Sequence, residues 1–205
     1  MEQLEFASKK DSITRVIASS GVFQIELLEH VGENDFSTLI EISKHLAQEY
    51  GEKAILTKAT IHKYFNKKSS LPFIARYRGD IIGYIVGVPI EELSSEPWAR
   101  MDENFGKYNT LYTYAFVIMA QYKGNGYAKM LKRVYLNWAK KRGSIRYITG
   151  HVQVGSNSLY SPQIKIISRI ENWQNSGRIF EYYRRELRPN GTASTVNTPP
   201  HADTI

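Results

Sequence analysis

The chain has 205 residues, of which 42% are hydrophobic and 12% aromatic, enough to build a sizeable core in one domain. It contains no cysteine, which excludes disulfides, thiolate metal sites and a cysteine nucleophile and favours a reducing cytoplasm. The formal net charge of +7 indicates a surface that attracts anions. A basic but merely solvated surface, a polyphosphate ligand and nucleic acid are the three alternatives.

The chain shows no targeting or membrane-spanning segment. Its first thirty residues carry five acidic side chains and no long apolar core, which argues against a signal peptide. No apolar run approaches the ~20 residues that a membrane-spanning helix requires. We therefore expect a cytoplasmic protein that does not bind membranes.

The first elements predicted along the chain are a strand and two helices. Residues 23–30 alternate between apolar and polar positions, which is typical of a strand. Residues 35–51 have helical periodicity with Asp35 as candidate N-cap, and residues 57–68 form a shorter helix capped by Thr57. The residues before them, 1–22, are expected to be an N-terminal extension.

A hairpin and a long loop come next. Two β-rich runs, 72–77 and 81–88, are joined at Gly79-Asp80, a dipeptide suited to a tight turn. The polar segment 92–109 contains Trp98 and is longer than most connections in a compact domain. Its length suggests a functional loop.

The middle of the chain reads as strand, helix and strand over residues 110–120, 125–142 and 145–155. A helical crossover of this kind joins parallel strands, while the other strands follow one another as hairpins. The predicted fold is therefore α/β in the α+β sense, with a mixed, mostly antiparallel central sheet and flanking helices.

The last folded elements are weaker. Residues 156–167 suggest a short irregular helix, and residues 169–174 and 178–187 suggest two strands. Residues 188–205 are rich in Thr, Ser, Pro and Asn, so we expect a disordered tail after a single domain that spans 1–187.

A glycine-rich turn links the strand 110–120 to the following helix in the sequence QYKGNGYAKML (121–131). The first amides of a helix lack internal partners, and glycines let such a backbone curl around an anion. Gly124, Asn125 and Gly126 lie where such a nest would form, Ala128 keeps the next turn narrow, and Lys123 adds charge. The alternative is a plain turn without a ligand. The spacing fits neither the G-x-G-x-x-G fingerprint nor a P-loop.

The segment FVIMAQYKGNGYAKMLKRVYLNWAKKRG resembles motif A of the GNAT superfamily of acyl-CoA-dependent N-acyltransferases, whose pattern is [Q/R]-x-x-G-x-[G/A]. Lys123 stands at the Gln/Arg position, Gly126 at the glycine and Ala128 at the Gly/Ala position. The resemblance covers roughly 23–187, with specific matches between about 110 and 157, and it implies a GNAT-like fold.

The resemblance also implies contacts with acetyl-CoA, the expected acyl donor. The pyrophosphate would bind the amides of the glycine turn, and the pantetheine arm would pair with the backbone of Ile118 and Met119, one of whose amides would meet the thioester oxygen. Asn157 stands where the family often places an asparagine that binds the CoA arm. The amides of the turn are those of Gly124, Asn125, Gly126, Tyr127 and Ala128.

Transfer of an acetyl group to a primary amine by direct attack in a ternary complex needs no serine or cysteine nucleophile. His151 is the candidate base, because an unperturbed imidazole has a pKa near 6.5; a histidine on a half-exposed strand is the alternative. The family often has a tyrosine proton donor at the position that is Ile164 here. Tyr160 is the nearest replacement.

The acceptor amine is not identified by the sequence. Trp98 and Trp173 could form the floor of its binding site, although core packing is the alternative for these rings. Glu171 and Glu181 could attract an ammonium group. No histidine pair has metal-ligand spacing, so no metal is expected. A non-catalytic acyl-CoA-binding module is the second hypothesis, nucleic-acid binding ranks below both, and a homodimer is open.

Overall fold

The computed structural model describes residues 10–155 and 163–187. The strands are β1 (Ile13–Ser20), β2 (Phe23–His30), β3 (Leu71–Tyr77), β4 (Asp80–Pro89), β5 (Thr110–Ile118), β6 (Tyr147–Gln153), β7 (Ile164–Ile170) and β8 (Phe180–Glu186). The helices are α1 (Glu33–Tyr50), α2 (Lys58–Phe65), α3 (Pro97–Arg100) and α4 (Tyr127–Lys141). Short 3₁₀ turns lie at Glu52–Ala54, Ile90–Leu93, Ala120–Tyr122 and Trp173–Asn175.

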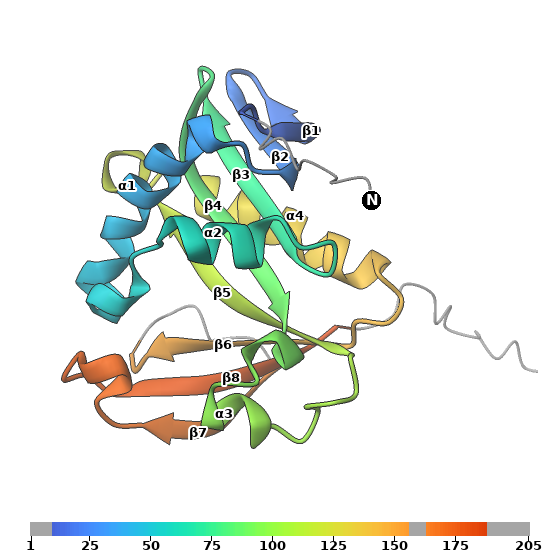
Figure 1. The fold of residues 1–205 in the computed structure, drawn as a ribbon, viewed down its shortest axis with the longest axis vertical. Helices are drawn as coiled ribbons and strands as arrows, with labels where there is room; N and C mark the ends of the chain where they lie inside the picture. Colours follow the sequence, from blue (N-terminus) through green and yellow to red (C-terminus); the bar gives the residue numbers. More distant parts are fainter. Residues whose placement is uncertain (1–9, 156–162, 188–205) are drawn as a thin grey trace, which may run out of the picture.

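The strands form one sheet in the order β1-β2-β3-β4-β5-β6-β8-β7. Only β5 and β6 are parallel, and every other neighbouring pair is antiparallel. Helices α1 and α2 cover one face and α4 covers the other (Figure 1). The predicted mixed, mostly antiparallel sheet with flanking helices is confirmed.

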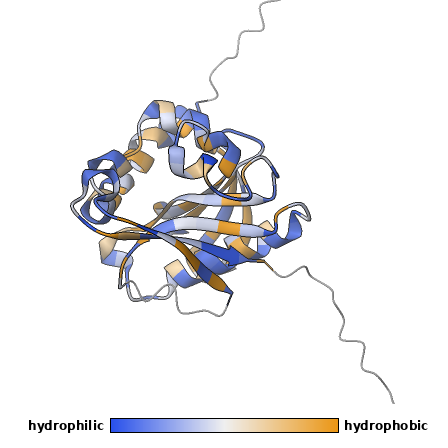
Figure 2. Cartoon of the chain, turned by 90° about the horizontal axis from the view of Figure 1, so that it is seen from below, coloured by the Kyte–Doolittle hydropathy of each residue, from blue (hydrophilic) through white to orange (hydrophobic). Residues whose placement is uncertain are grey.

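Each face of the sheet has its own hydrophobic core. On one face, α1 contributes Phe36, Leu39 and Ile42 to a cluster with the strands. On the other face, α4 buries Leu131, Tyr135 and Ala139 against β3, β4 and β5. The helices carry both hydrophilic and hydrophobic positions, as expected of elements with one side on a core (Figure 2).

Several predicted boundaries differ from the structure in the N-terminal half. Residues 13–20, expected to belong to an extension, form β1 and pair with β2 at the edge of the sheet. Helix α1 begins at Glu33 after Gly32, so Asp35 is not its N-cap, whereas Thr57 caps α2 through a capping box with Thr60. The β3–β4 turn consists of Arg78 and Gly79, both with positive φ, rather than Gly79-Asp80.

The end of the sheet was predicted least well. The helix expected over 156–167 is wrong at residues 164–167, because these belong to β7, which pairs with β8. The strand expected at 169–174 ends at Ile170, and Trp173–Asn175 form a 3₁₀ turn. β7 is an exposed edge strand, so its side chains lack the alternation that identifies a strand in sequence. The predicted tail 188–205 lies outside the described residues.

β5 and β6 separate after a short paired stretch, which leaves one edge of β5 open. The two strands pair only from Thr110–Tyr147 to Tyr112–Thr149, and beyond this point no described residue pairs with the free edge of β5. One extra residue, Tyr114, bulges from β5 against β4 between Thr113 and Ala115. The second half of β5 therefore has one paired edge and one open edge.

Candidate active site

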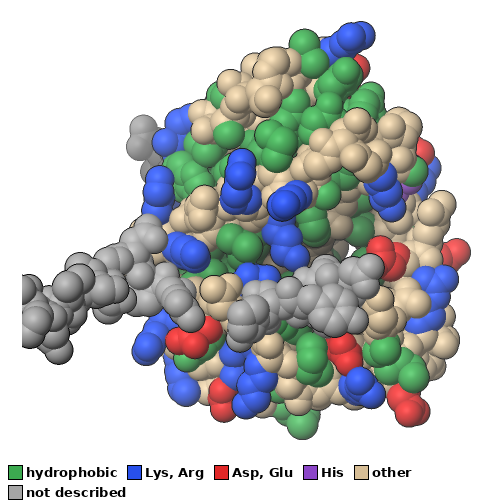
Figure 3. All heavy atoms as spheres, turned by 180° about the vertical axis from the view of Figure 1, so that it is seen from behind, with side chains coloured by type: hydrophobic (Ala, Val, Ile, Leu, Met, Phe, Trp, Pro, Cys, Tyr) green, Lys and Arg blue, Asp and Glu red, His purple; other side chains and the backbone are tan. Residues whose placement is uncertain are grey.

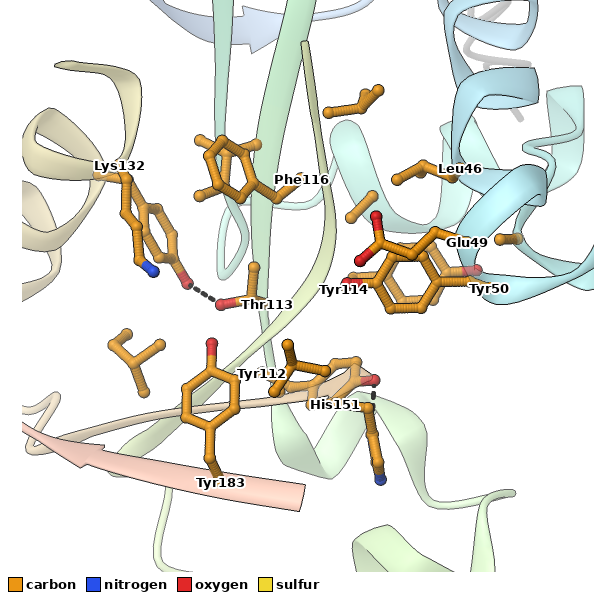
Figure 4. Close-up of a pocket in the computed structure, with 18 of the residues that line it drawn as sticks. Leu46, Glu49, Tyr50, Tyr112, Thr113, Tyr114, Phe116, Lys132, His151 and Tyr183 are labelled. Atoms are coloured by element: carbon orange, nitrogen blue, oxygen red, sulfur yellow. Dashed lines mark hydrogen bonds between the residues drawn. The ribbon is translucent and has the colours of Figure 1, made fainter. Parts of the chain in front are cut away.

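A cavity of about 550 Å³ follows the open edge of β5. It reaches both faces of the sheet: residues of α4 line one side, and residues of α1 and α2 line the other. In the close-up, Lys132 and Tyr183 lie on the α4 side of β5, whereas Glu49, Tyr50 and Tyr114 lie on the α1 side (Figure 4). We call the part on the α4 side the donor half and the part on the α1 side the acceptor half, after the substrates that the sequence resemblance leads us to expect there.

The donor half begins at the glycine turn before α4. Gly124 and Gly126 have φ angles of +86° and +79°, which only glycine adopts readily, and a side chain at either position would meet open space. In the part of the chain that the structure describes, no backbone hydrogen bond is donated by an amide between Gly124 and Lys129. The turn thus presents a run of unpaired N–H groups at the positive end of α4, the arrangement that binds phosphate.

The open edge of β5 supplies further donors. The amide of Met119 donates to the carbonyl of Ile82 at 2.9 Å, so Met119 is not free to meet a thioester oxygen as the sequence suggested. Because successive residues of an antiparallel strand point their N–H groups to opposite sides, the amides of Ile118 and Phe116 face away from β4. Sequence analysis missed Phe116, because only the register with β4 shows which amides are free.

The donor half is positively charged. Lys123, Lys132 and Arg185 line it, and no acidic residue of the described chain lines it with them. Burial lowers the pKa of Lys132, and the charge of Arg185 lowers it further. Seen from the α4 side, Lys and Arg side chains gather around the hollow of the molecule (Figure 3). Three cations that line the donor half without a carboxylate beside them indicate an anionic ligand.

Three hydroxyl groups lie next to Lys132. The Tyr135 hydroxyl is 3.4 Å from Thr113 Oγ1, and the Tyr183 ring points its hydroxyl toward the same threonine (Figure 4). Burial raises the pKa of both tyrosines, so both hydroxyls stay protonated at neutral pH and can donate hydrogen bonds.

His151 lies in the acceptor half but is not suited to be a base. Burial lowers its pKa to about 3, so the imidazole is neutral and weakly basic at pH 7. Its Nδ1 is 2.9 Å from the Tyr112 hydroxyl, and its Nε2 is buried without a partner among the described residues. The unperturbed pKa that made His151 a candidate base therefore does not apply in this environment.

Aromatic rings form the floor and walls of the acceptor half. Trp173 stacks on His151 with ring centroids 3.7 Å apart, and Trp98 lies 4.8 Å from the same imidazole. On the opposite wall, Tyr64 and Tyr114 lie 4.3 Å apart. Trp98 and Trp173 therefore occupy the region in which the sequence analysis expected them.

The carboxylates of the acceptor half are not the predicted ones. Glu181 pairs with Arg169, and Glu171 is not among the residues that line the cavity. Glu49 at the end of α1 and Glu96 at the start of α3 line the cavity instead. The sequence contained no signal for either, because both are exposed glutamates at helix ends, and only the fold shows that both line the cavity.

A buried ion pair holds the loop that carries Trp98 against the sheet. Arg184 of β8 donates from Nη2 to both carboxylate oxygens of Asp102 at 2.9 Å, and Tyr182 donates to the same carboxylate at 2.7 Å. Burial alone would raise the pKa of Asp102, but the hydrogen bonds from Tyr182, the Asn104 amide and Arg184 lower it below its usual value. The loop 92–109 is thereby fixed to the last strands.

Comparison with known proteins identifies the fold and the family. Residues 39–161, more than half of the chain, match the acetyltransferase (GNAT) family. The chain belongs to this family. It is an acyl-CoA-dependent N-acetyltransferase. A search of curated proteins found no match.

Solved acetyltransferases share the fold at low sequence identity. A GNAT family acetyltransferase from Streptococcus pneumoniae superposes with a TM-score of 0.60 at 15% identity, over 81% of this chain and 99% of the other. The ribosomal-protein-S18-alanine N-acetyltransferase from Escherichia coli gives 0.59 at 11% identity, over 83% and 97%. A GNAT family acetyltransferase from Elizabethkingia anophelis with acetyl-CoA bound gives 0.53 at 15% identity, over 82% and 100%.

Some expected features of this acetyltransferase stay predictions. Tyr160 and Asn157 lie outside the described residues. Within the described ranges no three metal-ligating side chains cluster, and no helix there is long and apolar enough to cross a membrane. Of the residues assigned to acetyl-CoA, Ile118, Lys123 and Ala128 line the cavity, whereas Met119 and residues 124–127 are not among its lining residues.

Proposed function

We propose that this acetyltransferase transfers the acetyl group directly to a primary amine while both substrates occupy the one cavity. The observation that carries the proposal is the run of unpaired amides from Gly124 to Lys129, next to the free edge of β5. The diphosphate of acetyl-CoA would bind this run, and the pantetheine arm would lie along β5.

The free amides of β5 would stabilise the reaction at the carbonyl. With the arm along β5, the N–H of Phe116 or Ile118 would donate to the thioester oxygen as negative charge develops on it. The ammonium group first gives a proton to water, and the neutral amine then attacks the carbonyl carbon from the acceptor half. As the new carbon–nitrogen bond forms, the nitrogen loses a second proton to water, the carbon–sulfur bond breaks, and CoA leaves as a thiolate. Tyr160 is proposed as the proton donor to that thiolate, as in the sequence analysis.

The basic residues fit this role better than a role in nucleic-acid binding. Lys123, Lys132 and Arg185 face the cavity, where the phosphates and the leaving thiolate would lie. We therefore propose that these basic residues bind CoA rather than nucleic acid.

Calorimetric titration with acetyl-CoA tests the proposal. The wild type should bind at micromolar to millimolar concentration, and Gly126→Glu should abolish binding, because a carboxylate in the turn repels the diphosphate and strains a φ of +79°. Gly143→Glu is the matched control, since Gly143 has open space around it and no positive φ. A wild type that ignores acetyl-CoA at millimolar concentration would disprove the proposal.

Measurement of CoA release separates the enzyme from the second hypothesis, a non-catalytic acyl-CoA-binding module. A mixture of primary amines should release CoA from bound acetyl-CoA. A module without catalysis would bind acetyl-CoA and release none under the same conditions.

A further inference from the structure

The two halves of the cavity have opposite charge. All charged residues that line the donor half are cations, whereas Glu49 and Glu96 line the acceptor half. Neither carboxylate forms an ion pair with a described residue, and one cation, Lys53, lies at the same mouth. Lys53 lies beside these carboxylates, and the Arg178 guanidinium is bonded to main-chain carbonyls of Gln48 and Glu49, so both carboxylates stay available to a cationic group in the acceptor half.

The interior of the acceptor half favours an apolar or aromatic body. Its walls are the ring pairs Tyr64–Tyr114 and Trp98–Tyr112, the latter with centroids 4.7 Å apart. His151 adds a neutral ring rather than a charge, because its pKa is about 3, so nothing buried there repels a cation. Rings of this kind bind apolar groups and the faces of cations.

The turn between β7 and β8 is bonded to the end of α1 beside the acceptor half. Arg178 Nη1 donates to the carbonyls of Gln48 and Glu49 at 2.8 and 3.1 Å, which caps the C-terminal end of α1. Tyr50 and Phe180 pack at 5.3 Å between the same two elements. The α1 end and the β7–β8 turn lie side by side in Figure 1. The turn also contributes Trp173 and Gln174 to the lining of the cavity, so this contact fixes the position of that lining.

We propose that the acceptor is a small primary amine, cationic at neutral pH, with an aromatic or apolar body, held by Glu49 and Glu96 at its ammonium group and by the tyrosine and tryptophan rings at its body. This inference rests on the proposed acetyl transfer and adds the class of substrate. A peptide N-terminus presented by a folded protein is the competing class and is the alternative outcome of the test.

Steady-state CoA release with three acceptors tests the class: 2-phenylethylamine, ethylamine and a tetrapeptide with a free alanine N-terminus. The KM for 2-phenylethylamine should be about tenfold below that for ethylamine, because the rings bury its body. Glu49→Gln should raise the KM for 2-phenylethylamine about fivefold and leave the KM for acetyl-CoA unchanged. Glu52→Gln, an exposed glutamate that does not line the cavity, is the matched control and should change neither constant.

A binding measurement makes the inference independent of turnover. Calorimetry on the protein saturated with CoA should show binding of 2-phenylethylamine and much weaker binding of its neutral analogue 2-phenylethanol. Efficient acetylation of the tetrapeptide without turnover or binding of 2-phenylethylamine would overturn the substrate class while leaving acetyl transfer intact. Failure of acetyl-CoA to bind at all would instead overturn the proposed function.

Discussion

At the scale of single residues, the environment of a side chain decides its chemistry, and His151 is the clearest case. The imidazole is 6% exposed, is stacked on Trp173 and has one nitrogen bonded to Tyr112. Burial disfavours its charged form and lowers its pKa to about 3. The residue type that pointed to a base thus serves here to complete an aromatic wall.

The depressed pKa of His151 predicts a pH dependence of stability. In the unfolded chain this histidine titrates near 6.5, so below that pH the unfolded state binds a proton that the folded state does not. The stability that a neutral His151 confers is present above pH 6.5 and is lost as pH falls toward 3. Between pH 7 and 5 the free energy of unfolding should fall by about 2 kcal/mol from this group alone.

Urea denaturation of His151→Gln at the two pH values measures that contribution. The variant keeps a hydrogen-bonding side chain but cannot titrate. Between pH 7 and 5 its free energy of unfolding should therefore fall by about 2 kcal/mol less than that of the wild type. Equal losses in the wild type and the variant would show that His151 is not held neutral.

At the scale of elements, the long loop 92–109 depends on one buried contact with β8. The Asp102 carboxylate is fully buried and accepts from Arg184, Tyr182 and the Asn104 amide. These bonds hold α3, and with it Trp98, over the acceptor half. The loop therefore belongs to the active site through its anchor as much as through its own residues.

Asp102→Asn should cost roughly 3–5 kcal/mol, because it removes the buried charge partner of Arg184 and leaves the guanidinium only the exposed carboxylate of Glu103. If enough protein stays folded, the KM for the acceptor should rise while the KM for acetyl-CoA changes little, since the donor half does not include this loop. Glu29→Gln, which removes an exposed pair with Arg15, should cost under about 1 kcal/mol. Similar unfolding midpoints for the two variants would contradict the role of the anchor.

At the scale of the whole molecule, one cavity crosses the sheet and joins both halves. Donor and acceptor can therefore be bound at the same time, and holding them together supplies much of the catalytic effect without a covalent enzyme intermediate. The charges of the two halves suit an anionic donor and a cationic acceptor.

Initial-velocity kinetics test this arrangement. Double-reciprocal plots against acetyl-CoA at several amine concentrations should intersect, as expected of a ternary complex. Intact-protein mass spectrometry after incubation with acetyl-CoA alone should show no acetylated enzyme. Parallel lines together with an acetylated residue would establish a ping-pong mechanism with a covalent intermediate instead.

The sequence by itself determined the fold class, the glycine turn and the family resemblance, because these depend on local periodicity and on glycines that a positive φ requires. It did not reveal β1, β7 or the carboxylates of the acceptor half. β7 is an exposed edge strand without alternation, and Glu49 and Glu96 come from elements far apart in the chain. Only the tertiary structure decided which amides of β5 are free and that His151 is neutral, since register and burial arise from packing between distant segments.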